Sequence, residues 1–247
     1  RKESSAASDV YKRQGQPCTY PDSLVGQAGY HMGDMACSIG QHTWNAAVWS
    51  AHAATHAAAL VLEGERATYA LCRPPGHHAY ADRANGFTYL NNAAIAAQYL
   101  RRQHPRVAIL DVDVHHGNGT QGIFWRRSDV LTLSLHGDPH FCTPFFTGHA
   151  HERGEGEGLG YNLNYPLARG TGTDDYLHAL ARACQAIRDF QPGALVVALG
   201  LDAHERDPYK ALAVSTEGFA RITGEIARLG LPTVFVQEGG YLSLIHI

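Results

Sequence analysis

Residues 106–121 read RVAILDVDVHHGNGTQ. The first part, Val107–Leu110, is apolar, which is typical of a strand buried on both faces of a parallel sheet. Asp111, Asp113 and His115 follow at a spacing of two, so a continuing strand would direct all three side chains to one face. Isolated buried charges are very unfavourable, and a divalent cation suits this mixture of oxygen and nitrogen ligands. The stretch therefore predicts a metal site at a strand end, with zinc or iron as the ion.

The composition indicates one soluble α/β domain. The 247 residues are enough for a sizeable core, and 45% of them are hydrophobic and 17% charged. The formal net charge of −3 shows no footprint for nucleic acid or an anionic membrane. No apolar run is long enough to span a bilayer. The five cysteines form no CxxC pair, which favours reduced thiols in a cytoplasmic enzyme.

Both ends of the chain have the character of non-native sequence. Residues 1–14 (RKESSAASDVYKRQ) are polar without a period, and residues 243–247 (SLIHI) stop directly after a motif. We expect residues 15–242 to form one domain that is truncated at both ends. Within it we find no linker and no internal repeat.

Strand and helix patterns alternate along this domain. Apolar runs predict strands at 68–71, 107–110, 130–135, 194–199 and 233–236, and helical patterns occur at 44–62, 89–100, 173–190 and 216–229. Such alternation predicts an α/β fold with a mostly parallel sheet and helices on both faces.

Polar side chains follow each predicted strand. They are His77 and His78, then Asp111, Asp113 and His115, then His136 and Asp138, then Asp202 and His204, and finally Glu238 and Tyr241. Ligands of parallel sheets bind beyond the carboxyl ends of the strands. We therefore expect a single site, and the alternative interpretation is a set of separate hydrogen-bonded strand caps.

Three of these residues have the composition of a catalytic metal site. Asp113, His115 and Asp202 would supply three protein ligands and leave a position open. A metal ion held there lowers the pKa of water and polarises a carbonyl group.

The other polar residues supply the remaining parts of a hydrolytic site. His77 and His78 are candidates for proton transfer, because imidazole is the usual acid–base group near neutral pH. Asp111 and Asn118 are the available partners to orient them. The hydroxyl of Tyr241 could donate to a developing oxyanion. Together with a metal, these residues predict hydrolysis of a carbonyl compound.

The chain resembles the histone deacetylase family, which includes bacterial acetylpolyamine amidohydrolases and class II-like deacetylases. The resemblance runs from about Gly26 to Tyr241 and rests on six motifs in order: RPPGHHA (73–79), GFTYLNNAAIAA (86–97), DVDVHHGNGTQ (111–121), SLHGDP (134–139), LGLDAHERDP (199–208) and EGGY (238–241). It implies an arginase/deacetylase-like fold.

The resemblance also implies a role for each candidate residue. Asp113, His115 and Asp202 would be the ligands of zinc. His77 and His78 would be tandem catalytic histidines, with His78 as the general acid and base. Asp111 would pair with His77, and Asn118 would orient His78. Tyr241 would polarise the carbonyl of the substrate.

Substrate and potassium sites follow from the same resemblance. Phe87 and Phe146 would be the aromatic walls of the substrate tunnel, and Gly86 would offer a backbone acceptor. A structural potassium ion would bind to Asp111, to the backbone carbonyls of Asp113, His115 and Leu135, and to the hydroxyl of Ser134.

Three features bear on the branch of the family. Asn118 in place of an aspartate is similar to the class II and polyamine branch. The segment Gly26–Trp44 resembles a loop that helps to form a homodimer and narrows the tunnel. The position expected for a polyamine-selecting glutamate holds Ala36, which leaves Asp34 and Glu155 as candidates to bind a substrate ammonium.

We predict a zinc-dependent deacetylase that hydrolyses an N-acetyl amide, with an acetylpolyamine or acetyl-diamine as substrate. The alternative substrate is acetyl-lysine in a protein. Two other functions compete with deacetylation. One is a non-catalytic module that captures acetylated ligands, and the other is a binuclear ureohydrolase such as arginase. The last needs an additional bridging carboxylate where this chain has Gly117.

Overall fold

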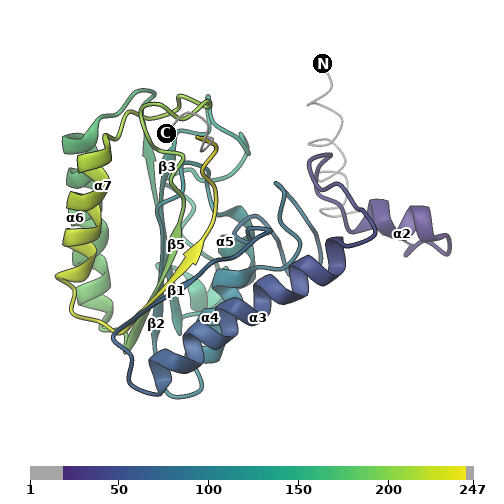
Figure 1. Cartoon of the computed structure of the whole chain (residues 1–247), viewed down its shortest axis with the longest axis horizontal. Helices are drawn as coiled ribbons and strands as arrows, with labels where there is room; N and C mark the ends of the chain where they lie inside the picture. Colours follow the sequence, from purple (N-terminus) through teal and green to yellow (C-terminus); the bar gives the residue numbers. More distant parts are fainter. Residues whose placement is uncertain (1–18, 243–247) are drawn as a thin grey trace.

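The computed structural model describes residues 19–242 (Figure 1). The segments 1–14 and 243–247, which we expect to be non-native, lie outside the described residues. The domain limits of 15 and 242 therefore stay a prediction.

Six strands form one sheet in the order β1-β6-β5-β2-β3-β4, and every neighbouring pair is parallel. The strands are β1 (Ala67–Ala70), β2 (Val107–Asp111), β3 (Val130–Gly137), β4 (Asn162–Leu167), β5 (Ala194–Leu199) and β6 (Thr233–Gln237). The central strands β2, β3 and β5 are buried along their whole length, as continuous apolar runs require. The predicted parallel sheet is confirmed.

Helices cover both faces of the sheet, as predicted (Figure 1). They are α2 (Leu24–Tyr30), α3 (Thr43–Leu62), α4 (Asn92–Leu100), α5 (Asn118–Phe124), α6 (Thr173–Phe190) and α7 (Thr216–Ala227), with a short 3₁₀ turn η1 (Gly156–Gly158). Helices α6 and α7 lie on one face, and α3 and α4 lie on the other, while α2 projects away from the body. Across residues 19–242, no helix combines the length and apolarity needed to cross a membrane.

Successive residues of β2 enter two separate cores. Ala108 and Leu110 pack in the cluster that includes α6 and α7, whereas Val107 and Ile109 pack in the cluster that includes α3 and α4. Half of the buried residues in the second core are alanine. Because alanine is small, α3 and α4 can lie close to the sheet and to each other. This two-sided burial fixes β2 and hence the segment that follows it.

The structure differs from the sequence prediction at β2. The strand ends at Asp111, and residues 112–115 continue as an irregular segment. The amide of Val112 still donates to the carbonyl of Ala198 on β5, at 2.9 Å. Beyond this point the backbone amides bond to carboxylates instead of a neighbouring strand. The polar side chains therefore determine the path of the chain here, together with one bond from the amide of Gly137 on β3 to the carbonyl of Val114 at 2.8 Å.

Three further differences have local causes. Helix α4 begins at Asn92, later than the predicted Tyr89, because the side chain of Asn91 caps the amide of Ala94 at 2.9 Å. The strand β4 was not predicted because its buried positions include Asn162 and Asn164, which interrupt any apolar run. Helix α5 has seven residues, two of them glycine, and so shows no helical period.

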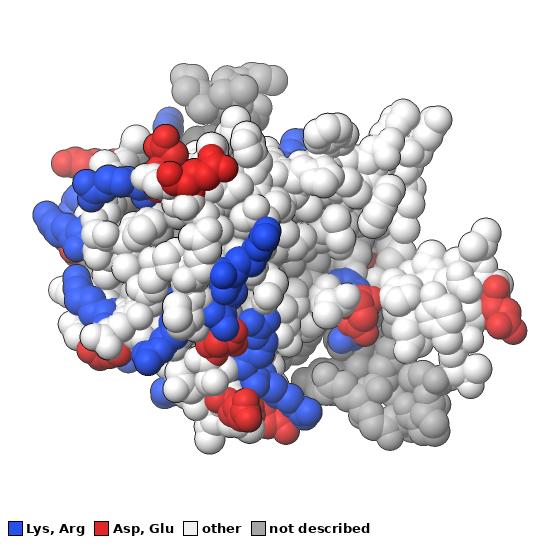
Figure 2. Space-filling view, turned by 90° about the horizontal axis from the view of Figure 1, so that it is seen from below, with Lys and Arg blue, Asp and Glu red and all other residues white. Residues whose placement is uncertain are grey.

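Charges of both signs lie side by side on the face shown in Figure 2. Among the ion pairs, Asp129 contacts both Arg101 and Arg127 at 2.6 Å. Glu155 contacts Arg126 at 3.1 Å. The carboxylate of Glu155 is therefore already paired, and it is one of the two groups that we considered for binding an ammonium.

Candidate functional site

The order of the strands explains why distant motifs meet. Strands β1, β6, β5 and β2 are consecutive neighbours in the sheet, and all run in the same direction. The segments that leave their carboxyl ends must therefore converge at one edge. They carry His77 and His78 after β1, Tyr241 after β6, Asp202 after β5, and Asp113 and His115 after β2.

Asp113, His115 and Asp202 form a buried triad at this edge. Each offers one ligand atom, and these atoms all lie within 4.8 Å of one another. The Nδ1 atom of His115 lies 3.0 Å from Oδ1 of Asp113 and 3.1 Å from Oδ2 of Asp202. Both carboxylates are fully buried, and His115 is only 5% exposed. Three oxygen and nitrogen donors this close together could hold a metal ion.

Backbone amides orient the two carboxylates. Gly239 donates to Oδ2 of Asp113 at 2.8 Å, and Val114 donates to Oδ1 of Asp202 at 2.9 Å. The approach is possible only for glycine. A Cβ atom on Gly239 would lie 2.4 Å from Oδ2 of Asp202, and one on Gly200 would lie 2.2 Å from Oδ2 of Asp113. Gly239 therefore lets the backbone hold Asp113, and Gly200 leaves room for the same carboxylate.

The electrostatics of the triad fit a bound cation. Burial, followed by the charge of Asp113, raises the pKa of Asp202 to about 6. Burial also acts against ionisation of Asp113, but His77 and His115 outweigh it and hold its pKa below the usual range. Two buried carboxylates in contact with one imidazole require positive charge to remain ionised together. A divalent cation among the three donors supplies that charge.

The histidine pair lies beside the triad. The rings of His77 and His78 are 4.1 Å apart between centroids, and His78 is 6.1 Å from His115. His77 donates from Nδ1 to Oδ2 of Asp111 at 2.8 Å, and His78 donates from Nδ1 to Oδ1 of Asn118 at 2.6 Å. These bonds set the tautomer of each ring and leave Nε2 of His78 as the atom that can accept a proton.

The two histidines differ in charge. Burial opposes the imidazolium of His77, but the carboxylates of Asp111, Asp113 and Glu238 outweigh it and raise the pKa of His77 to about 10. Burial, together with the charge of His77, lowers the pKa of His78 well below its ordinary value. At neutral pH the pair thus consists of one charged and one neutral imidazole. Such a pair can hold one proton and accept another.

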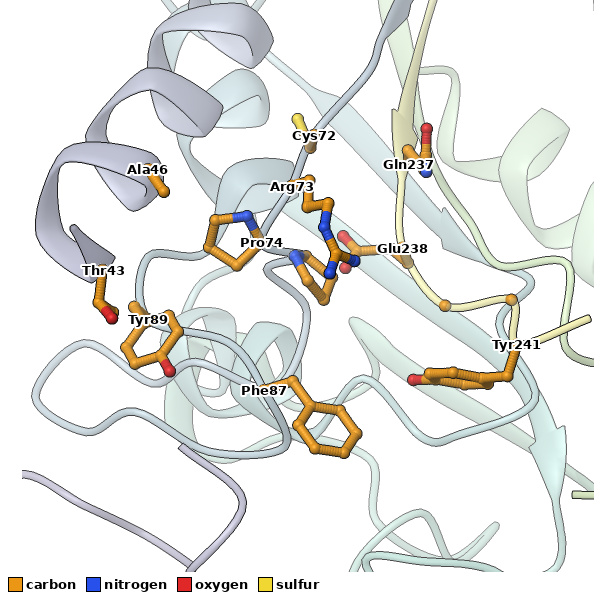
Figure 3. A pocket seen from close by; sticks show the side chains of 13 residues that line it. Thr43, Ala46, Cys72, Arg73, Pro74, Phe87, Tyr89, Gln237, Glu238 and Tyr241 are labelled. Carbon is orange, nitrogen blue, oxygen red and sulfur yellow. The ribbon is translucent and has the colours of Figure 1, made fainter. Parts of the chain in front are cut away.

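Tyr241 and Phe87 lie against one another at the mouth of the site, with ring centroids 6.4 Å apart. In Figure 3 the hydroxyl end of Tyr241 points into a pocket of about 520 Å³, and the ring of Phe87 lies beside it. Gly239, which bonds to Asp113, lines the same pocket, whereas the triad and the histidine pair do not line it. Burial, followed by the charges of Asp113 and Asp202, raises the pKa of Tyr241. The phenol therefore keeps its proton at neutral pH and can act as a donor.

Two contributors had no individual role in our prediction, although Glu238 was expected at the site and both lie in quoted motifs. Glu238 accepts hydrogen bonds from the amides of Gly76 (2.7 Å) and His77 (3.0 Å), so it anchors the turn that carries the histidine pair. Asp207 accepts a hydrogen bond from the amide of Tyr241 at 2.9 Å. The sequence signal for Glu238 is its position directly after a predicted strand, and for Asp207 it is only a place within a motif. In both cases the amide that the carboxylate binds lies far along the chain.

Tyr209 is a third contributor, and it has no sequence signal. Its ring centroid lies 5.0 Å from that of His115 and 5.0 Å from that of Tyr241. The ring is about half exposed, so it forms part of the rim of the site. Nothing in its sequence context distinguishes it from an ordinary loop tyrosine.

The predicted positions of Phe146 and potassium have only partial support. Phe146 is half-buried in the loop after β3, and its neighbour Thr147 bonds to Nδ1 of His116 at 3.0 Å. For potassium, Asp111 and Ser134 are register partners on β2 and β3. The hydroxyl of Ser134 is hydrogen-bonded to His136 at 2.8 Å. Both sites stay predictions.

A histone deacetylase domain matches residues 4–245. The chain belongs to the histone deacetylase family. It is 51% identical over 239 residues to an acetylpolyamine amidohydrolase of Burkholderia pseudomallei, and the match covers 96% of this chain and 68% of that protein. It is 50% identical over 222 residues to acetylpolyamine amidohydrolase 1 of Pseudomonas aeruginosa, and this match covers 90% of this chain and 64% of the relative.

Solved structures of the histone deacetylase family agree with this fold. A crystal structure of acetylpolyamine aminohydrolase from Burkholderia pseudomallei superposes with a TM-score of 0.88 at 46% identity, over 98% of this chain and 75% of the other. The HDA15 HD domain superposes with a TM-score of 0.81 at 35% identity, over 84% of this chain and 61% of the other. The chain thus spans about two thirds of the length of such relatives.

The comparisons confirm the family and the fold that the six motifs predict. They also confirm the predicted enzyme class, because this histone deacetylase family consists of amidohydrolases. Family membership and the buried triad together indicate a metal-dependent enzyme. The identity of the ion and the roles of single residues belong to the proposal below.

Proposed function

We propose that this chain is the catalytic domain, residues 15–242, of a zinc-dependent deacetylase that acts on a small acetylated polyamine or diamine. Water adds across the amide, the C–N bond breaks, and acetate and a free amine are released. The observation that carries the proposal is one sheet edge where Asp113, His115 and Asp202 adjoin a differently charged histidine pair and Tyr241. The acetylpolyamine amidohydrolases at about 50% identity support this choice of substrate.

Zinc suits the donor set of two carboxylates and one imidazole, and iron(II) is the alternative ion. Asp113, His115 and Asp202 would hold it. When bound, such an ion supplies Lewis acidity toward a carbonyl oxygen and toward water. The amides of Gly239 and Val114 would keep the carboxylates in place as ligands.

His78 is the group that moves the proton. Because it is neutral and its Nδ1 atom is occupied by Asn118, its Nε2 atom can take a proton from the attacking water. The same atom can then return the proton to the leaving amine nitrogen. His77 keeps its own proton because Asp111 stabilises the imidazolium. Its positive charge would favour the negative charge that develops on the substrate during attack.

Tyr241 would complete the oxyanion site. Its ring centroid lies 6.4 Å from that of His115, and its hydroxyl remains protonated at neutral pH, so it can donate to the carbonyl oxygen as negative charge develops there. Phe87 would form one wall around the acetyl group, with Gly86 as a backbone acceptor and Phe146 as the facing wall. A potassium ion at Asp111 and Ser134 would be structural.

One observation favours acetyl-lysine as the second candidate substrate. An ammonium-binding carboxylate would select a free diamine, but position 36 is alanine and Glu155 is paired with Arg126. Both carboxylate oxygens of Asp34 accept backbone hydrogen bonds, from Gly86 and Ala36. Among residues 19–242 these are the carboxylates that we considered for the ammonium, and each has a partner within the chain.

Substrate preference tests the proposal. The purified protein, loaded with zinc, is assayed for kcat/KM with acetylputrescine, acetylcadaverine and an acetyl-lysine peptide. We expect hydrolysis of all three, with the two diamines preferred. A preference for the peptide would contradict the proposed polyamine substrate and indicate acetyl-lysine in proteins instead. Binding of all three without release of acetate would refute deacetylation and indicate a module that only captures acetylated ligands.

A further inference from the structure

A two-residue turn carries Phe87 into the site. The turn is closed by two backbone hydrogen bonds between Asn85 and Thr88, at 3.1 and 2.9 Å. Its central residues Gly86 and Phe87 both have positive φ angles, of 52° and 67°. Glycine adopts this conformation freely, but a phenylalanine there is strained and persists only where its surroundings hold it. The turn therefore needs support from outside itself.

The position of this turn affects two parts of the site. A Cβ atom on Gly86 would lie 2.3 Å from Cδ2 of His78, so the backbone of the turn packs directly on the catalytic imidazole. The ring of Phe87 lies 6.4 Å from that of Tyr241. A small displacement of the turn would move the wall of the pocket and release the ring of His78 together.

The support comes from the N-terminal arm, His31–Ala36. Gly33 donates to the carbonyl of Ala84 at 2.7 Å, and Ala84 donates to the carbonyl of His31 at 2.8 Å. These bonds place Asp34 beside the turn.

The carboxylate of Asp34 ties the arm to the turn. Its Oδ2 atom accepts from the amide of Gly86 at 2.8 Å, and its Oδ1 atom accepts from the amide of Ala36 at 2.8 Å. Asp34 is half-buried, so these charge-assisted bonds are only partly exposed to competing water.

We propose that Asp34 is a positioning residue, which holds the Gly86–Phe87 turn in its strained conformation and so sets both the pocket wall and His78. This inference rests on the proposed deacetylase function. It differs from direct recognition of the substrate ammonium by Asp34, because both carboxylate oxygens already bind backbone amides. The arm thereby contributes to catalysis without contacting the substrate.

Two substrates of the same length separate positioning from ammonium binding. Acetylputrescine carries an ammonium, whereas N-pentylacetamide, which has a methyl group in place of that ammonium, is neutral. Asp34→Asn keeps the shape of the side chain. Because an asparagine side chain has only one acceptor oxygen, it can accept from the amide of Gly86 or of Ala36 but not from both. We expect KM to rise about tenfold for both substrates, with a fall in kcat through His78. Asp22→Asn is the control, because Asp22 precedes α2, lies outside the arm and is exposed.

The outcomes are distinct. A loss confined to acetylputrescine would assign Asp34 to the ammonium and overturn the proposal. A fall in kcat with KM unchanged for both substrates would mean only that less enzyme is folded, and would also overturn it. Equal rises in KM for the charged and the neutral substrate support positioning.

Hydrogen exchange of the Gly86 amide gives a test that does not depend on activity. In Asp34→Ala this amide loses its acceptor, so we expect its exchange to become at least about tenfold faster while the amides of β2 stay protected. Unchanged exchange at Gly86 would overturn the proposal. If the wild-type protein hydrolysed neither substrate, the proposed function would fail, and the exchange result would still decide whether Asp34 holds the turn.

Discussion

The carboxylate of Asp207 accepts a hydrogen bond from the backbone amide of Tyr241 at 2.9 Å, across 34 positions of the chain. Its other oxygen accepts from the amide of Tyr209 at 3.0 Å. Asp207 is fully buried, so water does not compete for these bonds. Tyr241 follows Gly239 and Gly240, a pair that allows the backbone many conformations. Asp207 therefore selects the one conformation in which the tyrosine reaches the pocket.

Replacing Asp207 by alanine tests this contact. We expect Asp207→Ala to lower kcat by up to about two orders of magnitude, as for a misplaced oxyanion donor, with metal content unchanged. The variant also loses stability, by about 1–3 kcal/mol for each buried amide left without a partner. Asp207→Asn keeps one acceptor oxygen, so its kcat should lie between those of the wild type and of Asp207→Ala. Full activity in folded Asp207→Ala would show that the tyrosine is held by other contacts.

Tyr241→Phe removes the hydroxyl and leaves the ring. Because the phenol is the proposed donor to the oxyanion, we expect kcat to fall by about 10²- to 10³-fold with little change in bound metal. The measurement is steady-state turnover with elemental analysis of the same sample. Tyr69→Phe serves as the control, since Tyr69 lies on the edge strand β1 and is about half exposed. Turnover equal to the wild type would remove Tyr241 from the mechanism.

Asp202→Ala removes one proposed ligand. We expect the affinity for zinc to fall by at least about 100-fold, because loss of even an outer partner of a ligand costs 10- to 100-fold. Metal content after dialysis against a weak chelator measures this. Asp189→Ala, at the exposed end of α6, should retain the ion. A stoichiometric ion in Asp202→Ala would assign the site to other residues.

Gly239→Ala tests the close approach of the backbone to the triad. The added methyl group would lie 2.4 Å from Asp202 and 2.6 Å from Asp113, so both carboxylates must move. We expect weaker metal binding and a loss of activity of at least about tenfold. Gly224→Ala is the control. Position 224 lies in α7 with no atom near the added Cβ, so alanine there should raise stability by about 0.5–1 kcal/mol. Equal effects of the two changes would contradict the role of Gly239.

Asp129 gives a prediction for pH dependence away from the site. Hydrogen bonds from Arg127 oppose the effect of burial and, with Arg101, hold the pKa of Asp129 below its usual range. Because its pKa is lower in the folded state, the ionised Asp129 stabilises the fold at pH values above its pKa in the unfolded chain, about 3.9. This contribution disappears as the pH falls through the pKa of Asp129 in the folded protein. We expect Asp129→Asn to lower the free energy of unfolding by about 1–2 kcal/mol at pH 7, and the difference to shrink below pH about 4.

Urea unfolding of both proteins at pH 7, 5 and 3 measures this difference. The gap should be similar at pH 7 and 5 and smaller at pH 3. A gap that stays constant down to pH 3 would show that the ion pair with the two arginines contributes nothing measurable.

Much of the fold could be predicted from local patterns. The strands β2, β3, β5 and β6 are apolar runs, and the helices α3, α6 and α7 have lengths and ends close to those predicted. Elements without a local period could not be predicted, namely β4 with its buried asparagines and the glycine-containing α5. The carboxylates after β2 and β5 were also visible, because charged side chains directly after a buried strand need a partner.

The sequence by itself determined which residues can carry the chemistry, since residue type and spacing along one strand end are local properties. Only the tertiary structure decided how they meet. The order β1-β6-β5-β2 brings four strand ends together, and the links from Asp34 to Gly86 and from Asp207 to Tyr241 depend on the path of the chain. A backbone amide looks the same at every position in a sequence. Its partner becomes known only when folding buries the two groups side by side.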